Sequence, residues 1–492
     1  MTASEKRYFK RHYSSDKSLV TSLFDFINSL SGYDEEQVKE YFKNSKLSKN
    51  LKVYKVQLTD ILLKSLVSYH NKKNIHSKIR IGLEEIDILM DKQVFEMAQN
   101  KIKRIKDICI KNEAFEYIFP ILAKEQILNS FYSANFDGTK KENYQKLNSY
   151  LSSINEIFHL QHTSHQLSDQ KNHILTNQLG PKKKVAYQNV LKKELEKLND
   201  DVGSVRERYY RYHVISMIYR MVENDLGKEN KYKKEQVDLL KNNPDFTSSH
   251  PKLYFASTYN YLSSCWKLRQ YHTLEKGLPE VKAFIKKHPV LEPSYLFVYY
   301  LEIPVLYFNE FKGFDATFEA KVIKHIKKQK QEKDFLASLM YLHFAILHLI
   351  FENHKKVHYF LRRIRENLST LAPAYEPLLY TIEMYSHFQS GDLAVAQNLV
   401  NAYLRKQKRN PIENDNTFNQ VILFFQDLIK TKSIPERSKK ATVFESTIYS
   451  QMTGSLRNLL EEYGFSVWLN SLIHKEKLKD HLIKIYRNLN KS

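Results

Sequence analysis

Glycine and proline are scarce in this chain, which has only 11 glycines and 12 prolines among 492 residues. Together they reach less than half of their usual share of about 12%. Tight turns, β-bulges and phosphate-binding loops depend on these two residues, so a fold with many of them is difficult to build here. The sequence therefore predicts an all-α fold, an array of antiparallel helical hairpins.

Apolar residues recur with the period of an α-helix in the stretches between the few glycines. Leu58, Leu62 and Leu66 form one such stripe, and Leu83, Ile86 and Met90 form another. Spacings of three, four and seven residues place apolar side chains on one helix face. We expect about twenty helices, mostly joined by short connections that make sequence neighbours antiparallel.

The positions of the few glycines and prolines indicate where helices end. Pro120 and Pro304 lie inside apolar helical patterns, where a proline kinks a helix or occupies its first turn. Glycine after an apolar-periodic segment is typical of a helix terminus. The glycines in this position are Gly32, Gly138, Gly227, Gly313 and Gly391.

The length of the chain predicts more than one domain, because a single hydrophobic core stops growing at about 250–300 residues. Residues 161–202 are poor in apolar side chains and contain the Gly180–Pro181 pair. We expect an N-terminal helical domain over 1–160, a polar helical connector over 161–202 and a C-terminal helical-repeat domain over 203–492. Shorter loops are expected at residues 242–251, 410–416 and 432–441.

The net charge and the cysteine content limit which cell compartment and which kind of partner can be expected. The net charge of +22 favours an anionic partner, although the codon bias of an AT-rich genome also enriches lysine. Cys109 and Cys265 are too few for a disulfide framework and are expected to be buried thiols. The stretch from Phe335 to Phe351 is interrupted by polar residues, which predicts a buried core helix and no membrane span. With no apolar run of a signal peptide near the N-terminus, we expect a cytoplasmic protein.

Two distant segments share a local pattern. Phe95 and Leu393 each open a helix after a polar turn, and a small residue, Ala98 or Ala396, follows three positions later. A small side chain at that point lets two helices of a hairpin cross closely. The chain here resembles tetratricopeptide-like (TPR-like) helical repeats, which implies an α-solenoid.

The match to the repeat consensus is incomplete, because Met384 and His387 stand where Gly and Tyr are usual. Two unrelated helical hairpins are the alternative interpretation. The first 130 residues or so are also similar to uncharacterised helical proteins common in Bacteroidetes. That second resemblance implies no activity and assigns no functional residue.

No catalytic motif stands out. Eleven glycines leave no Gly-rich phosphate loop or nucleophile elbow, so we predict that the protein is not an enzyme. The histidine-rich run at Glu156, His159, His162 and His165 is interpreted as a solvated helix face. The pairs His343/His348 and His354/His358 flank a turn, and the second has the spacing of a metal-binding pair but lacks the glutamate of HExxH. We predict no metal and no cofactor.

Basic residues cluster toward the C-terminal ends of several expected helices. In a solenoid these ends would form a ladder that contacts a phosphate backbone, but the helix dipole alone also favours cations there. Arginines interleaved with Tyr209 and Tyr212 suit stacking on single-stranded bases, although these tyrosines and Tyr219 also fit a core-facing stripe. The candidate anion contacts are Lys101, Lys103, Arg104, Lys106, Lys324, Lys327, Lys328, Arg362, Arg363, Arg365, Arg405, Lys406, Arg409, Arg206, Arg208 and Arg211.

The function predicted from these features is that of a cytoplasmic interaction scaffold. A protein or peptide partner would bind on the helical-repeat surface, which is an inference from architecture. The alternative is a nucleic-acid-associated protein that uses its basic helix ends on RNA or DNA backbone. The sequence does not specify an oligomeric state.

Overall fold

The computed structural model describes residues 1, 3–13, 18–30, 33–71, 75–131, 137–175, 181–198, 203–268, 270–308, 316–332, 334–366, 375–409, 416–451, 460 and 464–489. Every regular element within these ranges is a helix, which confirms the predicted all-α class. The chain divides into two compact units, Met1–Glu156 and Ile157–Ser492, and the division falls within one long helix, α9 (Asp137–Leu175).

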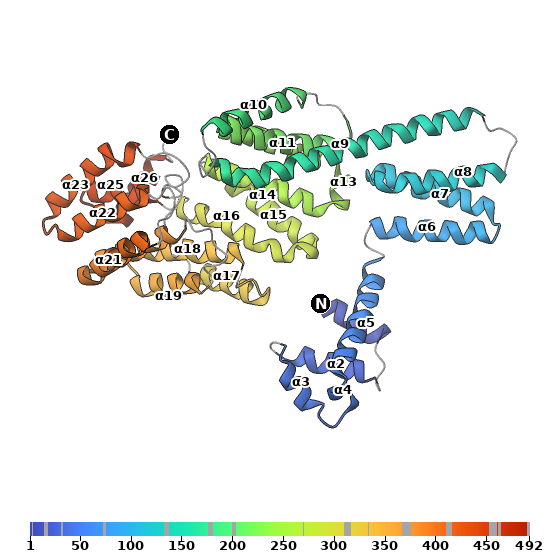
Figure 1. The fold of residues 1–492 in the computed structure, drawn as a ribbon, viewed down its shortest axis with the longest axis horizontal. Helices are drawn as coiled ribbons and strands as arrows, with labels where there is room; N and C mark the ends of the chain where they lie inside the picture. Colours follow the sequence, from blue (N-terminus) through green and yellow to red (C-terminus); the bar gives the residue numbers. More distant parts are fainter. Residues whose placement is uncertain are drawn as a thin grey trace. The chain divides into compact units, whose positions relative to one another are not determined.

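The first unit begins with a small helical cluster (Figure 1, blue). Its core is formed by fully or nearly fully buried side chains such as Phe9, Leu23 and Val38, which pack against Leu58 of the last helix of the cluster, α5. Asp34 caps one helix by accepting hydrogen bonds from the backbone N–H groups of the first turn. The helices are α1 (Ala3–His12), α2 (Leu19–Ser29), α3 (Glu35–Tyr41), α4 (Lys46–Lys49) and α5 (Leu51–Asn71).

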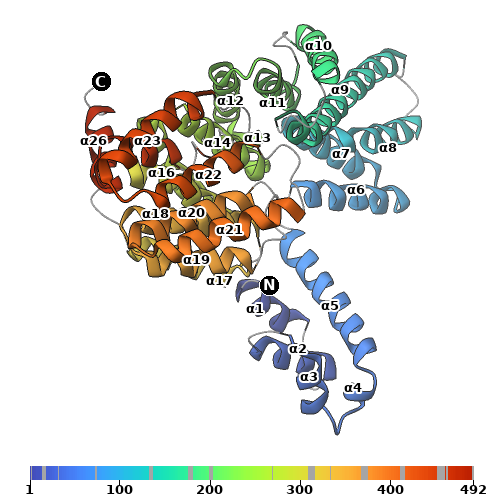
Figure 2. The same cartoon turned by 60° about the vertical axis from the view of Figure 1, so that its left-hand side comes forward.

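An antiparallel helical hairpin follows, formed by α6 (Ile75–Asp91) and α7 (Phe95–Lys111). It continues through η1 (Phe115–Tyr117) into α8 (Ile118–Phe131), which packs on α7 (Figures 1 and 2). Ala98 is fully buried in this hairpin. Gly82 of α6 permits the close crossing, because a Cβ added there would lie 2.3 Å from Cδ1 of Ile105 on α7.

Replacing Gly82 with alanine is expected to destabilise the α6–α7 hairpin by about 1 kcal/mol. The overpacking against Ile105 costs about 1–3 kcal/mol, and the better helix propensity of alanine returns about 1 kcal/mol. Hydrogen exchange measured by mass spectrometry should show faster exchange of the α6 and α7 amides. The matched control is Glu84→Ala on the exposed face of the same helix. Slower exchange in the Gly82 variant would contradict this account of the crossing.

The second unit continues the succession of helices from the end of α9 to the C-terminal region. Neighbours in sequence pack against each other through most of it, as in the pairs α11 with α12, α18 with α19 and α20 with α21. Its helices are α10 (Pro181–Lys197), α11 (Val205–Val222), α12 (Leu226–Lys241), α13 (Pro244–Ser249), α14 (Pro251–Lys267), α15 (Tyr271–Lys287), η2 (Pro289–Ser294), α16 (Tyr295–Phe308), α17 (Ala316–Lys328), α18 (Phe335–Ile350), α19 (His354–Arg365), α20 (Tyr375–Ser390), α21 (Leu393–Arg409), α22 (Asn416–Lys430), α23 (Ile434–Thr447), η4 (Tyr449–Gln451), α25 (Phe465–Ile473) and α26 (Leu478–Leu489).

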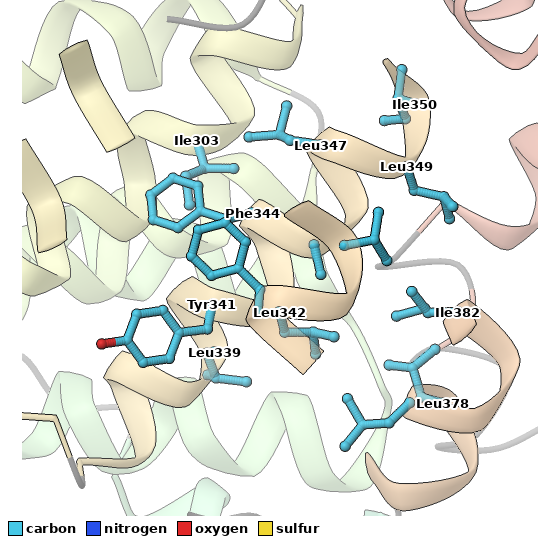
Figure 3. Packing of buried hydrophobic residues seen from close by; sticks show 14 of the residues in the cluster. Ile303, Leu339, Tyr341, Leu342, Phe344, Leu347, Leu349, Ile350, Leu378 and Ile382 are labelled. Atoms are coloured by element: carbon cyan, nitrogen blue, oxygen red, sulfur yellow. The ribbon is translucent and has the colours of Figure 1, made fainter. Parts of the chain in front are cut away.

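Helix α18 is the centre of the second unit's core. It is apolar on all sides, and almost all of its side chains are buried, which confirms the predicted core helix. Phe344 lies near Ile303 of α16, while the other side of the helix faces Leu378 and Ile382 of α20 (Figure 3). A helix that is hydrophobic all round is stable only when neighbours surround it. No helix among the described residues combines the length and the apolar character needed to cross a membrane.

A buried polar network joins three helices of this core. The carboxylate of Glu319 on α17 lies 2.6 Å from Nε2 of His348 on α18 and 2.5 Å from Nζ of Lys356 on α19. Glu319 is 5% exposed and His348 is 3% exposed. Burial raises the pKa of Glu319, but the hydrogen bonds from His348 and Lys356 outweigh it and lower the pKa below its ordinary value. The network therefore holds an ionised carboxylate inside an apolar core.

Several glycines and prolines lie close to helix ends, whereas Gly82 lies inside α6 and Gly277 and Pro279 lie inside α15. Gly391 has a positive φ of 85° directly after α20, whereas Gly227 lies in the first turn of α12 and Pro120 in the first turn of α8. Residues 242–251 and 432–441 were predicted as loops, but they contain α13 and the start of α23. A proline near the start of each helix is tolerated, because the backbone N–H groups of the first turn have no acceptor within the helix. Gly32, Gly313 and residues 410–415 lie outside the described residues.

The segment predicted as a polar connector, 161–202, contains the end of α9 and all of α10. Leu167 of α9 and Leu191 of α10 pack against Val214 and Ile218 of α11, together with Leu160 just before the segment. The segment therefore contributes to the core of the second unit and does not form a separate linker. Its apolar residues are sparse but spaced by seven, which is enough to keep a narrow stripe facing one neighbour.

Candidate binding groove on α6 and α7

A groove with a volume of about 550 Å³ runs between the last turns of α6 and the first turns of α7. It is open to solvent along its length and lies entirely within the first unit. Its floor and walls combine apolar, amide and charged side chains. The lining residues are Glu85, Ile88 and Leu89 from α6, and Met97, Asn100, Lys101 and Arg104 from α7.

The turn between the two helices positions these side chains. Gln93 adopts a left-handed backbone conformation with φ of 57°, and the N–H of Val94 donates to the carbonyl of Leu89 at 2.9 Å. This arrangement ends α6 and satisfies one of its last carbonyl groups. Because the connection is so short, the end of α6 lies beside the beginning of α7.

The groove exposes apolar surface. Ile88 and Met97 are each 59% exposed, although the same helices have a fully buried face that includes Ile86 and Ala98. These two side chains leave a small apolar surface of the groove open to solvent. These two residues were not singled out in the sequence analysis. The signal was present in Ile88, which lies off the apolar stripe of Leu83, Ile86 and Met90.

The charged residues of the groove leave a positive edge. Lys101 forms an ion pair with Glu85 across the groove. Arg104 and Lys103 are exposed, and neither forms an ion pair in the part of the chain that the structure describes. Lys106 points away toward α8, where it lies 2.7 Å from a carboxylate oxygen of Glu125. Of the four basic residues predicted on this helix, Lys101 and Lys106 therefore form ion pairs with carboxylates.

Apart from the three arginines of α11, the basic residues predicted on the second unit lie toward the C-terminal ends of three separate helices, α17, α19 and α21. Several of them are used in ion pairs with neighbouring helices. Lys328 lies 2.5 Å from Glu292, Arg365 pairs with Glu383 through both guanidinium nitrogens, and Lys406 pairs with Glu376. Arg365 and Lys406 each join two consecutive helices, and Lys328 joins α17 to η2, which favours a structural role for these cations.

The other predicted cations of these helices are at the surface. Arg363 lies 3.3 Å from Glu366 on its own helix, and Arg405 donates to the carbonyl of Asn401. The remaining four are exposed and have no ion pair among the described residues, so they are the cations still available to an anionic partner. They are Lys324, Lys327, Arg362 and Arg409.

The arginine and tyrosine patch on α11 is largely packed. Arg206, Arg208 and Arg211 are half-buried. Tyr209 is 6% exposed, and burial raises its pKa to about 12. Tyr219 stacks on Tyr232 of α12 with ring centroids 5.5 Å apart. The core-facing interpretation of these tyrosines is the one that the packing supports.

The histidine and cysteine candidates lie in different environments. His159, His162 and His165 are exposed along α9, and His159 lies 3.2 Å from Glu194 of α10. Both cysteines are buried and free, as predicted. Burial raises the pKa of Cys109 to about 12 and raises that of Cys265 as well. Both groups are therefore protonated thiols near neutral pH and are poor nucleophiles.

The helices and the groove define a class of protein, an all-α chain of packed helical hairpins with an open amphipathic groove on one of them. No protein-family model, no curated protein and no solved structure matches the chain.

Proposed function

We propose that this protein is a non-enzymatic, cytoplasmic interaction scaffold whose α6–α7 groove binds a short acidic, amphipathic segment of a partner protein. The single observation that carries the proposal is the juxtaposition of exposed Ile88 and Met97 with Arg104 in one open groove. The tetratricopeptide-like arrangement of the hairpins belongs to the same proposal, since such repeats present grooves to peptide partners.

The chemistry of the groove specifies the occupant. An apolar side chain inserted between Ile88 and Met97 would remove both from water, at roughly 25 cal/mol per Å² of apolar surface buried. A carboxylate beside that side chain would pair with Arg104, which has no ion-pair partner among the described residues. A segment with both features is amphipathic and acidic, which is the pattern of a helix or peptide docked in a groove.

The second class of partner, a nucleic acid, is less well supported. Phosphate binding requires several unneutralised cations on one surface. Lys328, Arg365 and Lys406 already hold carboxylates, and the α7 cluster lies in the other unit. We therefore favour the protein partner and treat nucleic acid as an outcome of the test.

A photo-crosslinking amino acid placed at Met97 in the full-length chain, expressed in its native cells, tests this proposal. We expect protein adducts of defined mass whose crosslinked segment, identified by mass spectrometry, carries Asp or Glu next to an apolar residue. The same crosslinker at Gln99 is the control, because Gln99 is exposed on α7 but does not line the groove. Adducts to nucleic acid, or adducts equal to those at Gln99, would overturn the proposal.

Ile88→Asp is expected to weaken binding of the crosslinked segment, made as a synthetic peptide, by at least about tenfold. The substitution removes apolar contact and adds a negative charge that repels an acidic peptide. Ile88 is exposed, so folding should be unaffected, as circular dichroism would verify. Fluorescence polarisation measures the affinity, with Gln99→Asp as the charge-matched control. Equal affinity in the two variants would place the binding site elsewhere.

A further inference from the structure

Helices α19 and α20 each carry a pair of metal-ligating residues at i and i+4. His354 and His358 share one face of α19, and Glu383 and His387 share one face of α20. The two helices are neighbours in the second unit and pack against each other. The fold thus brings two pairs together that lie 25 to 33 residues apart in sequence.

Three of these residues converge on one point. The ligand atoms of His358, Glu383 and His387 all lie within 4.8 Å of one another. In a tetrahedral zinc site with bonds of about 2.0–2.2 Å, two ligand atoms lie roughly 3.4 Å apart. Small changes of side-chain torsion therefore suffice to bring the three onto one ion. The rings of His358 and His387 are stacked with centroids 4.4 Å apart.

The cluster contains one buried polar atom without a hydrogen-bond partner. Nδ1 of His387 is buried and makes no hydrogen bond, and its nearest carboxylate oxygen, on Asp392, lies 3.6 Å away. His354 is better satisfied, because its Nδ1 lies 3.0 Å from the hydroxyl of Ser386. A buried imidazole nitrogen without a hydrogen-bond partner costs free energy. A cation bound to one ring nitrogen, with a carboxylate accepting from the other, would offset this cost.

The surrounding charges are compatible with a dication. Glu383 accepts hydrogen bonds from Arg365 on both oxygens, yet each carboxylate oxygen has a second lone pair for a metal. The Asp392 carboxylate adds a second negative charge beside His387.

We propose that His358, Glu383 and His387 form a binding site for a divalent transition metal such as Zn²⁺, with water as the fourth ligand. Two imidazoles and one carboxylate form a ligand set that suits zinc. The site is half-buried and links α19 to α20, so a bound ion would fasten these two helices. The sequence alone predicts no metal, because Glu383 and His387 lie on a different helix from the histidine pair His354/His358.

Titration of the metal-free full-length protein with Zn²⁺, followed by calorimetry, tests this inference. We expect one equivalent to bind, with a rise in the midpoint of thermal unfolding because the ion binds only the folded state. Co²⁺ in place of Zn²⁺ should give the visible absorption of a four-coordinate site. A stoichiometry of zero at this site would overturn the proposal.

The variants separate this site from the exposed histidines elsewhere. His358→Gln and His387→Gln should each weaken Zn²⁺ binding by at least about a hundredfold, since each removes one of three protein ligands. Glu383→Gln keeps one acceptor oxygen for Arg365 but loses the second hydrogen bond and the negative charge, so the folding of this variant is checked by circular dichroism. His272→Ala is the matched control, an exposed helical histidine of the same unit. If the three variants bind Zn²⁺ as tightly as the control, the ion sits on surface histidines and the proposal fails.

Discussion

Replacing His348 with leucine is expected to lower the free energy of unfolding of the second unit by about 3 kcal/mol. The reason is the Glu319 carboxylate, which is buried between α17, α18 and α19 and would keep only Lys356 as its partner. A buried charge that loses a partner pays its full desolvation cost. The measurement is urea unfolding followed by tryptophan fluorescence, since both tryptophans, Trp266 and Trp468, belong to this unit.

A double variant distinguishes the buried charge from simple loss of packing. In Glu319→Met/His348→Leu, the carboxylate is removed together with its imidazole partner, and Lys356 remains half-exposed to water. We expect the double variant to be more stable than His348→Leu alone, because apolar replacement of a whole buried pair is often neutral or stabilising. If the two losses simply add, His348 acts through packing and the electrostatic account is wrong.

The second unit is expected to lose stability as the pH falls from 6.5 to about 5, and His343 is a main cause. Full burial lowers the pKa of His343 from 6.5 to about 3. Below pH 6.5 the unfolded chain therefore binds a proton that the folded chain does not bind until about pH 3. Each pH unit in this window costs up to about 1.4 kcal/mol for one such group. The stabilisation is complete above pH 6.5.

The effect of His343 can be isolated from that of the carboxylates. Glu319 has a lowered pKa, so its contribution is lost only below its ordinary value of 4.5, outside the window from pH 5 to 6.5. His343→Gln removes the titrating group and should reduce the pH dependence of urea unfolding by about 1 kcal/mol per pH unit in that window. His272→Gln, at an exposed histidine, should leave it unchanged. An unaltered slope in the His343 variant would contradict the prediction.

Local patterns predicted individual helices well, because each depends on the spacing of its own side chains. The core helix that begins at Phe335 follows from its run of apolar residues. The end of α20 at Ser390 follows from Gly391, which adopts a positive φ that glycine allows. The short helix at Pro244 was missed, because a proline that starts a helix looks like one that ends a loop. The wide spacing of Leu160 and Leu167 concealed their burial against α11.

Candidate sites were harder to predict, since they depend on which helices become neighbours. The basic residues were visible in the sequence, but Glu292, Glu376 and Glu383, which pair with three of them, lie 18 to 36 residues away. The groove could not be predicted from the sequence, because it depends on Ile88 facing solvent beside Met97 across the short turn between α6 and α7. A one-dimensional pattern gives the face of a helix but not the partner of that face.

By itself, the sequence determined the helical class, the main core helix and the buried state of both thiols. The scarcity of glycine and proline and the apolar period act locally, through backbone freedom and side-chain spacing within one helix. Only the tertiary structure decided which cations are neutralised, where an amphipathic groove opens on α6 and α7, and how His358 meets Glu383 and His387. These features arise between helices, where packing brings side chains together that no local spacing relates.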